Sequence, residues 1–301
     1  MITILGPTAT GKTSLAANLA SLVNGEIISA DSRQVYRGMD IGTGKDLADY
    51  TVNNIEIPHH LVDIVDPGYE YNVFEFQRDF LEAYNKIDER GSIPILCGGT
   101  GLYIESVLKG YKLINVPNNE SLREELVLKE DEELVEILAS FKNLHNTTDS
   151  SERERLIRAI EIQKYYDDNP EIDTHFPEID TKIFGIDYDR RVVRMRITER
   201  LEERLQTGMI EEVEGLLNSG VKPEQLTFYG LEYKWVTDHL EGNLAYNEMF
   251  RRLNTAIHQF SKRQMTWFRR MEKQGFEINW IDGNLSLNEK IAFILNKLPK
   301  H

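Results

Sequence analysis

The chain has 301 residues, which at about 150 residues per domain allows one large domain or two ordinary ones. Hydrophobic residues make up 41% and charged residues 28%, the balance of a soluble globular protein with a buried core. No run of about 18 apolar residues occurs, which excludes a membrane-spanning helix. The formal net charge of −15 argues against a surface that is basic throughout, although it leaves local basic patches open.

The amino terminus and the single cysteine both point to the cytoplasm. Met1 is followed by apolar residues without a basic region, and a glycine-rich segment comes next, so we expect no secretory signal. Cys97 is the only cysteine, which excludes a disulfide framework and a Cys-based zinc site and fits a reducing compartment. We interpret it as a small buried hydrophobe.

The first motif in the chain is glycine-rich. Residues 2–5 predict a strand, and residues 14–20 have the periodicity of a helix. Between them stands the pattern G-x-x-x-x-G-K-[ST], which is the P-loop in its strand–loop–helix context: Gly6-Pro7-Thr8-Ala9-Thr10-Gly11-Lys12-Thr13. Backbone N–H groups, the helix N-terminus and Lys12 would hold a phosphate or diphosphate, and the Thr13 hydroxyl can bind Mg²⁺. An ordinary glycine-rich turn is the alternative, and the complete motif argues against it.

Two other patterns bear on which phosphate is bound. Residues 85–88 spell N-K-x-D, the guanine-reading pattern, but they fall inside a predicted amphipathic helix over about 73–87, so we interpret the match as coincidence. A metal-binding carboxylate of the Walker-B type could be Asp63 or Asp66, which follow a predicted strand at Leu61-Val62. A solvated aspartate at the end of a strand explains either residue equally well.

Two further predicted strands end in polar residues. Residues 26–30 lead to Asp31, and residues 93–97 lead to a glycine-rich turn with Thr100. The carboxyl ends of parallel strands form the ligand crevice of an open sheet, so both side chains are expected beside the P-loop. A carboxylate beside a bound diphosphate can accept a proton from an incoming nucleophile. The alternative is that Asp31 and Thr100 cap the helices that follow.

The order of elements predicts an α/β fold, a P-loop NTPase-like parallel sheet flanked by helices and interrupted by a helical insertion domain. We expect residues 1–115 and 183–301 to form the core with its C-terminal helices, and residues 116–182 to form the insertion. Within the second part of the core, long helices are predicted at 190–217 and 245–271. Strands are predicted at 182–186 and 276–281.

Two of these helices are rich in basic residues. Six arginines face three glutamates between 190 and 206, and Glu272 is the only acid among seven basic residues between 251 and 273. Solvated helix faces are the alternative interpretation. A basic cleft on an acidic protein would instead contact the phosphates of a nucleic acid, with salt-sensitive affinity.

Six motifs in chain order together resemble the bacterial tRNA dimethylallyltransferases, the IPP transferase family. They are the P-loop at 6–13, the D-S-x-Q-x-Y stretch within 28–43, and the stretches 58–61, 76–78, 98–103 and 262–269, the last reading K-R-Q-x-T-W-F-R. The similarity runs from about residue 1 to about residue 270. The P-loop is shared with many unrelated enzymes, and the D-S-x-Q-x-Y and K-R-Q-x-T-W-F-R stretches are far more specific.

The resemblance implies a reaction and its partners. A dimethylallyl group would pass from dimethylallyl diphosphate to N6 of the adenosine just 3′ of the anticodon in tRNA, with release of diphosphate. The P-loop would hold the donor's diphosphate, where a kinase would hold ATP, and the cofactor would be Mg²⁺ at Thr13. We expect a monomer that binds the anticodon stem-loop through the insertion.

The resemblance also implies roles for individual residues. Asp31 would be the general base and Thr100 would help to hold the reacting groups. Arg196 and Arg200 would assist the P-loop in binding the diphosphate. The expected tRNA-binding residues are Asp31, Ser32, Arg33, Gln34, Thr100, Arg123, Glu154, Arg155, Leu156, Ile157, Arg158, Lys262, Arg263, Gln264 and Arg269.

The chain departs from the family pattern at two places. Members usually carry G-T-A-K-P where this chain has Gly42-Thr43-Gly44-Lys45-Asp46, and G-Y-[KR] where it has Glu232-Tyr233-Lys234. A glutamate lacks the φ freedom of a glycine, so the local backbone there is expected to differ.

Three other functions stay open at this point. An adenylate isopentenyltransferase acting on free nucleotides would not need the basic helices, a small-molecule P-loop kinase would convert ATP to ADP, and a nucleotide-binding module would bind without turnover.

Overall fold

The computed structural model describes residues 1–141, 153–171 and 175–299. It contains two compact units: the first comprises Met1–Tyr111 and Pro177–His301, and the second comprises Lys112–Phe176. No helix in the described ranges is long and apolar enough to cross a membrane. Each unit is described by itself below.

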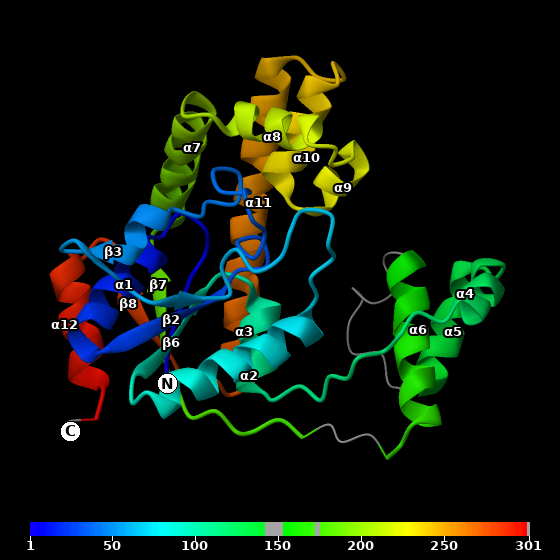
Figure 1. The fold of residues 1–301 in the computed structure, drawn as a ribbon, viewed down its shortest axis with the longest axis horizontal. Helices are drawn as coiled ribbons and strands as arrows, with labels where there is room; N and C mark the ends of the chain where they lie inside the picture. Colours follow the sequence, from blue (N-terminus) through cyan, green and yellow to red (C-terminus); the bar gives the residue numbers. More distant parts are fainter. Residues whose placement is uncertain (142–152, 172–174, 300–301) are drawn as a thin grey trace. The chain divides into compact units, whose positions relative to one another are not determined.

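All strands among the described residues belong to the first unit (Figure 1). They are β1 (Ile2–Leu5), β2 (Gly25–Ala30), β3 (Thr51–Val52), β4 (Ile55–Glu56), β5 (His59–His60), β6 (Ile93–Gly98), β7 (Lys182–Asp187) and β8 (Ile278–Asp282). Its helices are α1 (Lys12–Val23), the 3-10 helix η1 (Leu47–Tyr50), α2 (Val73–Glu89), α3 (Gly101–Leu108), α7 (Arg190–Gln206), α8 (Met209–Asn218), α9 (Pro223–Phe228), α10 (Leu231–Leu240), α11 (Tyr246–Lys273) and α12 (Leu287–Lys297). The second unit contains α4 (Glu120–Val127), α5 (Asp131–Phe141) and α6 (Arg153–Asp168).

Six strands form one parallel sheet in the order β5-β2-β6-β1-β7-β8, while β3 and β4 form a separate antiparallel pair. Strand β1 lies inside the sheet between β6 and β7, so the loop that follows it opens at the centre of the carboxyl edge. Every residue of β1 and β2 is buried, as parallel strands covered on both faces require. The sheet confirms the predicted α/β fold.

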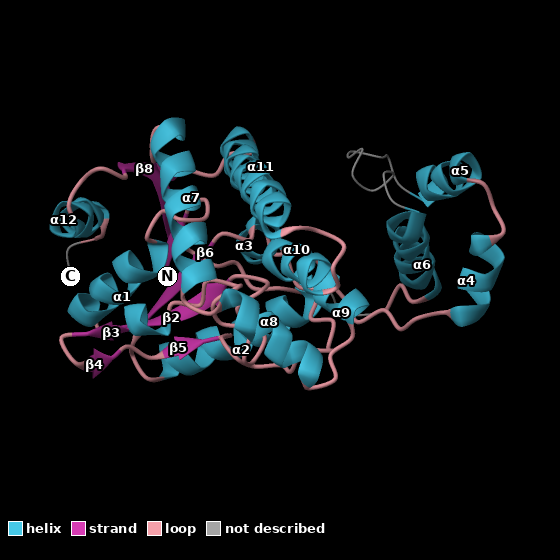
Figure 2. Cartoon of the chain, turned by 90° about the horizontal axis from the view of Figure 1, so that it is seen from above, coloured by secondary structure: helices cyan, strands magenta, loops and turns pink. Residues whose placement is uncertain are grey.

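Helices cover both faces of this sheet (Figure 2). Helix α1 packs on β2 and β6 and is joined by α12, and their apolar side chains share one buried cluster with the strands. Helices α2 and α3 pack against β6, and α11 packs against α3 and α7. Helix α2 begins with a capping box between Asn72 and Glu75 and buries Phe76, Phe80 and Ile87. The N-K-x-D tetrapeptide therefore lies within a helix, as predicted.

Two sequence expectations are wrong in detail. The helix predicted at 190–217 is two helices, α7 and α8, because Gly208 with φ of +112° turns the chain between them. The strand predicted at Leu61-Val62 ends two residues earlier, at His60. Leu61 has φ of +61° and Asp63 has φ of +55°, a left-handed conformation that cannot continue a strand.

The second unit has its own apolar core. Residues of α4, α5 and α6 form the cluster Leu122, Leu126, Leu134, Leu138, Leu156, Ile157 and Ile160. Asn119 begins α4 by accepting a hydrogen bond from the Leu122 N–H, a standard N-cap. This unit supplies the helical insertion that interrupts the α/β fold in sequence.

Candidate active site

The P-loop is built by the backbone between β1 and α1. Ala9 has φ of +63° and Gly11 has φ of +77°, so the chain curls back on itself before the helix begins. Thr10 Oγ1 donates to the Pro7 carbonyl at 2.8 Å and closes the turn. A Cβ at Gly6 would lie 3.1 Å from the Ile186 carbonyl oxygen, so a side chain there would crowd β7. These features give the predicted P-loop its curled backbone.

Lys12 lies at the start of α1 with its ammonium directed to the loop. Its Nζ donates to the Pro7 carbonyl at 2.7 Å. Burial lowers the pKa of Lys12 to about 8, and Arg200 lowers it further while Cys97 and Asp31 oppose the shift. The negative charge of a bound anion would stabilise the protonated form of this desolvated ammonium.

Arg196 and Arg200 project from α7 onto the same loop. Arg196 Nε donates to the Ala9 carbonyl at 2.8 Å, and an Arg200 amino group donates to Thr8 Oγ1. Burial, and then the neighbouring Arg204, lower the pKa of Arg200 to about 10. The structure thus brings both predicted arginines to the P-loop, although they are nearly 190 residues from it in sequence.

Helix α11 braces the loop from another side. Gln264 Oε1 accepts from the Thr8 N–H at 2.9 Å, and Gln264 Nε2 donates to the Gly99 carbonyl at 2.9 Å. The turn after β6 needs glycine at two positions: a Cβ at Gly99 would lie 2.5 Å from Gln264 Nε2, and one at Gly101 would lie 2.4 Å from Trp267. The K-R-Q-x-T-W-F-R motif therefore packs on the glycine-rich turn after β6. Gln264 is buried in these contacts.

Asp31 and Thr100 follow neighbouring strands at the carboxyl edge, where Ala30 of β2 pairs with Gly98 of β6. The Asp31 carboxylate accepts from the Arg33 N–H at 2.9 Å, and Thr100 Oγ1 accepts from the Ser32 N–H at 3.0 Å. The next helix of the described chain, η1, begins only at Leu47, so Asp31 caps no helix and the capping alternative is wrong for that residue. Thr100 occupies the N-cap position of α3, but its side chain makes no cap bond.

The residues after Asp31 have different surroundings. Arg33 stacks its guanidinium on Phe228 at 5.5 Å from the ring centre. Gln34 is buried: its Oε1 accepts from Ser29 Oγ at 3.2 Å, and its Nε2 donates to the Gly44 carbonyl at 3.1 Å. The Gln34 amide thus joins β2 to the following loop in this structure.

The arginines predicted in the insertion form a structural cluster. Arg123 and Arg158 both bind Glu161, whose side chain is buried. Burial raises the pKa of Glu161, but Arg123, the Asn119 N–H and Arg158 outweigh it and bring the pKa to about 2. These contacts tie α4 to α6.

The other residues of the predicted tRNA-binding stretch 154–158 differ in their exposure. Glu154 and Arg155 are exposed on α6. Leu156 and Ile157 are 1% and 7% exposed, in the core of the second unit. We predicted that Leu156 and Ile157 contact tRNA, and for their side chains this is wrong. Both side chains pack between helices, because the apolar face of α6 must be covered.

Three of the predicted cations on α11 are exposed. Lys262, Arg263 and Arg269 lie on the outer side of the helix, whereas Gln264 and Phe268 point inward. Arg251 and Arg252 on the same helix differ, because both are paired with Glu248. The basic surface of α11 is therefore concentrated in its second half.

Both Walker-B candidates are engaged elsewhere. Lys45 is buried and binds the Tyr36 carbonyl and Asp40, each at 2.7 Å, as well as Asp63. Asp66 pairs with Arg37 at 2.9 Å on the surface. Neither carboxylate is placed as a metal ligand by these contacts.

The sequence reasoning missed Glu212. Its carboxylate accepts from three consecutive backbone N–H groups, those of Asp40, Ile41 and Gly42, at 2.9, 2.7 and 3.0 Å. The Tyr233 hydroxyl donates to it at 2.7 Å. The G-Y-[KR] pattern includes Tyr233 and could have suggested a tethered tyrosine, but no pattern in one sequence pairs Glu212 with a loop about 170 residues away.

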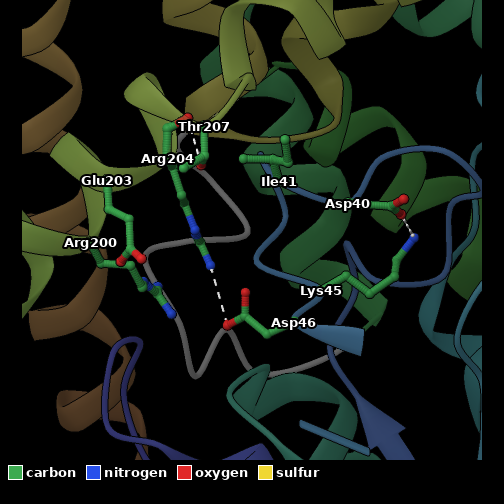
Figure 3. Close-up of a pocket in the computed structure, with 8 residues that line it drawn as sticks. All are labelled: Asp40, Ile41, Lys45, Asp46, Arg200, Glu203, Arg204 and Thr207. Carbon is green, nitrogen blue, oxygen red and sulfur yellow. Dashed lines mark hydrogen bonds and ion pairs between the residues drawn. The ribbon is translucent and has the colours of Figure 1, made fainter. Parts of the chain in front are cut away.

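A cavity of about 340 Å³ adjoins this loop within the first unit (Figure 3). Its lining comes from the 40–46 loop and from the C-terminal half of α7: Asp40, Ile41, Lys45, Asp46, Arg200, Glu203, Arg204 and Thr207. Arg200 belongs both to this lining and to the P-loop contacts, so the cavity lies directly beside the phosphate loop.

Mg²⁺ usually keeps several waters and takes few protein ligands beside substrate phosphates. Within the described residues, no group of three or more His, Cys, Asp or Glu side chains could hold a metal ion by itself. The residues fit a phosphate-borne Mg²⁺, because Thr13 stands in the first turn of α1 directly after Lys12. The Thr13 hydroxyl and the oxygens of a bound diphosphate would share that ion.

The central parallel strand, the P-loop and the polar residues on neighbouring strand ends define the class of P-loop proteins. The sequence pattern described as "IPP transferase" matches residues 34–271, and the one described as "Isopentenyl transferase" matches residues 1–54. The chain belongs to the IPP transferase family.

Relatives are similar over the whole length. The chain is 59% identical over 300 residues to "tRNA dimethylallyltransferase 2" of Bacteroides fragilis. The matched region covers 100% of this chain and 98% of the relative. It is 58% identical to "tRNA dimethylallyltransferase 2" of Porphyromonas gingivalis, with 98% of each chain covered. These similarities support the family assignment.

One solved structure agrees with this assignment, and a second agrees with the fold. The full-length tRNA isopentenylpyrophosphate transferase of Bacillus halodurans has a TM-score of 0.71 and 33% identity, covering 98% of this chain and 94% of that one. A eukaryotic dimethylallyltransferase acting on tRNA has a TM-score of 0.78 at 23% identity, covering 100% of this chain and 81% of that one, and speaks to the fold alone.

Proposed function

We propose that this protein transfers the dimethylallyl group of dimethylallyl diphosphate to N6 of the adenosine that follows the anticodon in tRNA. The observation that carries the proposal is the shared edge of the sheet. The P-loop, which Arg196 and Arg200 of α7 contact, follows β1, and Asp31 and Thr100 follow β2 and β6, the next strands in the same sheet. A diphosphate-binding group and a proton acceptor thus serve one crevice.

In this reaction the amine nitrogen forms a bond to the allylic carbon while the bond from that carbon to the diphosphate oxygen breaks. The electron pair leaves with the diphosphate, and Asp31 accepts the proton that the amine loses. Lys12, the loop N–H groups and the two arginines of α7 stabilise the charge that grows on the leaving group. Thr100 holds the turn around Ser32 through its hydroxyl.

The Thr13 hydroxyl would hold Mg²⁺, which would supply further charge neutralisation for the leaving group. The chain's own residues bind and orient the donor. Arg200 fixes Thr8, Gln264 fixes the Thr8 N–H, and both hold the loop open to a diphosphate. ATP is not a reactant in this proposal, although its phosphates could occupy the same loop.

Two parts of the chain would hold the tRNA. The exposed cations of α11, Lys262, Arg263 and Arg269, would contact backbone phosphates, and Arg33 with Ser32 would lie beside the reacting base. The helical insertion would grip the anticodon stem-loop, with Glu154 and Arg155 on its exposed side and Arg123 and Arg158 as its internal ties. The enzyme would act as a monomer in the cytoplasm.

One assay separates this function from the alternatives. The protein is incubated with labelled dimethylallyl diphosphate, Mg²⁺ and unmodified tRNA in ATP-free buffer, with AMP replacing tRNA in a parallel reaction. We expect label in tRNA and release of diphosphate. Label in AMP alone would indicate an adenylate isopentenyltransferase. A requirement for ATP with ADP formed in step with product would indicate a kinase.

A further inference from the structure

The departures from the family pattern converge on one side chain, Arg204 of α7. Asp46, in the place of a proline, lies with Oδ2 3.7 Å from Arg204 Nη2. Gly44, in the place of an alanine, leaves room for the guanidinium: a Cβ there would lie 2.2 Å from Nη2. Glu232, in the place of a glycine, is half-buried; desolvation raises its pKa, and Arg204 is the charge that most opposes the rise. Three substitutions therefore accommodate one arginine.

Arg204 is buried without being satisfied. The residue is 8% exposed, and its Nη2 has no hydrogen-bond partner among the described residues. The Asp46 oxygen at 3.7 Å is beyond hydrogen-bond distance. A buried donor of a charged group costs free energy when it is left unpaired, and such donors normally have a partner. The geometry indicates a missing acceptor.

The space for that acceptor is the cavity of about 340 Å³ beside the 40–46 loop. Figure 3 shows the guanidinium of Arg204 directed from α7 toward Asp46, with Arg200 next to it. The third cation of the lining, Lys45, already binds Asp40 and Asp63. Arg204 and Arg200 are therefore the lining cations directed to a ligand, and Arg200 also binds Thr8 of the P-loop.

We propose that Arg204 is a further diphosphate-binding residue and that this cavity receives the diphosphate next to the P-loop. The ligand is a diphosphate oxyanion, either within the donor or as the departing ion. Asp46 competes for the guanidinium when the anion is absent, since the two charges are close but not hydrogen-bonded. This inference rests on the proposed function for the identity of the diphosphate.

Calorimetric titration of the full-length protein, with Mg²⁺ and without tRNA, tests the proposal with two probes: inorganic diphosphate and dimethylallyl diphosphate. Arg204→Gln should weaken binding of at least one probe by about 10–100-fold, the range for a hydrogen bond to a charged group. Arg204→Lys should restore part of the affinity because it keeps the charge. Asp46→Asn should tighten binding because it removes the competing carboxylate.

Gly44→Ala displaces Arg204 without altering it and should weaken binding as Arg204→Gln does. Gly38→Ala is its matched control, because Gly38 has a nearly equal φ of +68° against +70° but a Cβ there meets nothing within 4 Å. Loss for inorganic diphosphate alone assigns the cavity to the departing ion, and loss for both probes assigns it to the donor as well.

Equal affinities for both probes in wild type, Arg204→Gln and Gly44→Ala, with Asp46→Asn unchanged, would overturn the proposal and make Arg204 a structural charge. Should Arg204→Gln fail to fold, the other variants decide. The labelled-tRNA assay is read separately. Arg204-dependent diphosphate binding in a protein that modifies no tRNA would refute the proposed function and leave the cavity site standing.

Discussion

At the scale of single residues, Lys12 combines a full charge with burial. Its pKa of about 8 in the free protein predicts that diphosphate affinity falls as the pH rises through 8. The sign follows from linkage: the anion prefers the protonated ammonium, so above pH 8 binding must take up a proton, and affinity drops up to about tenfold per pH unit.

Titration of inorganic diphosphate between pH 6.5 and 9.5 measures this dependence. Lys12→Arg is the control, because an arginine stays charged throughout the range while the diphosphate's own ionisations are unchanged. A pH profile identical in the two proteins would exclude Lys12 as the titrating group.

Asp31 is predicted to carry the proton transfer. Asp31→Asn keeps the side chain's size and its acceptor for the Arg33 N–H but cannot take a proton, so single-turnover prenyl transfer should slow by about 10²–10⁴-fold. The affinity for tRNA should hardly change. Asp66→Asn, on an exposed aspartate paired with Arg37, should leave the rate unchanged. Near-wild-type turnover in Asp31→Asn would remove the residue from this role.

At the scale of elements, the contact between α3 and α11 is close enough to be tested by one methyl group. Gly101→Ala would place a Cβ 2.4 Å from Trp267 Cδ1, so α11 must shift and carry Gln264 away from the P-loop. We expect a loss of about 1–3 kcal/mol in the free energy of unfolding, the usual cost of overpacking, together with a lower kcat.

Gly215→Ala in α8 is the control for this substitution. A Cβ at Gly215 meets nothing within 4 Å, and an alanine inside a helix should raise the free energy of unfolding slightly. Urea unfolding monitored by circular dichroism compares the two variants. Equal stability of Gly101→Ala and wild type would show that the helices accommodate the methyl group.

The strands and helices also show how much of the fold could be predicted from the sequence. The main strands other than β5, and the P-loop, follow from local patterns, since buried strands and glycine-rich turns are specified within a few residues. Strand β5 is two residues long, and its end depends on positive φ values at Leu61 and Asp63 that no local pattern required. The break at Gly208 was likewise hidden by apolar periodicity that continues on both sides of it.

The candidate site was predictable to the same extent. Asp31, Thr100 and Lys12 are placed by strand ends and by the P-loop motif. The burial of Leu156 and Ile157, the pairing of Arg123 with Glu161, and the role of Gln264 as a bridge depend on partners far away in the chain. Such pairings are tertiary, and a residue's type alone does not distinguish a binding arginine from a structural one.

At the scale of the whole molecule, a net charge of −15 coexists with the exposed cations Lys262, Arg263 and Arg269 on α11. We expect Lys262→Gln to weaken tRNA binding at all tRNA sequences alike and to reduce the slope of log affinity against log salt by about 1. Arg251→Gln is the matched control on the same helix, since Arg251 is already paired with Glu248. Filter binding at several salt concentrations measures both slopes, and equal slopes would contradict a phosphate contact at Lys262.

The Glu212 contact has a consequence for selectivity. Three successive N–H groups at 40–42 form a concavity of the kind that binds free anions, and the chain fills it with its own carboxylate. Beside the predicted phosphate-binding P-loop, the first unit therefore contains a backbone anion site that the Glu212 carboxylate occupies in this structure. A multiply charged substrate would find the P-loop open and the 40–42 site occupied, so it can bind in one orientation rather than two. Occupation of the 40–42 site by Glu212 is then as important for the orientation of the bound substrate as the affinity of the P-loop.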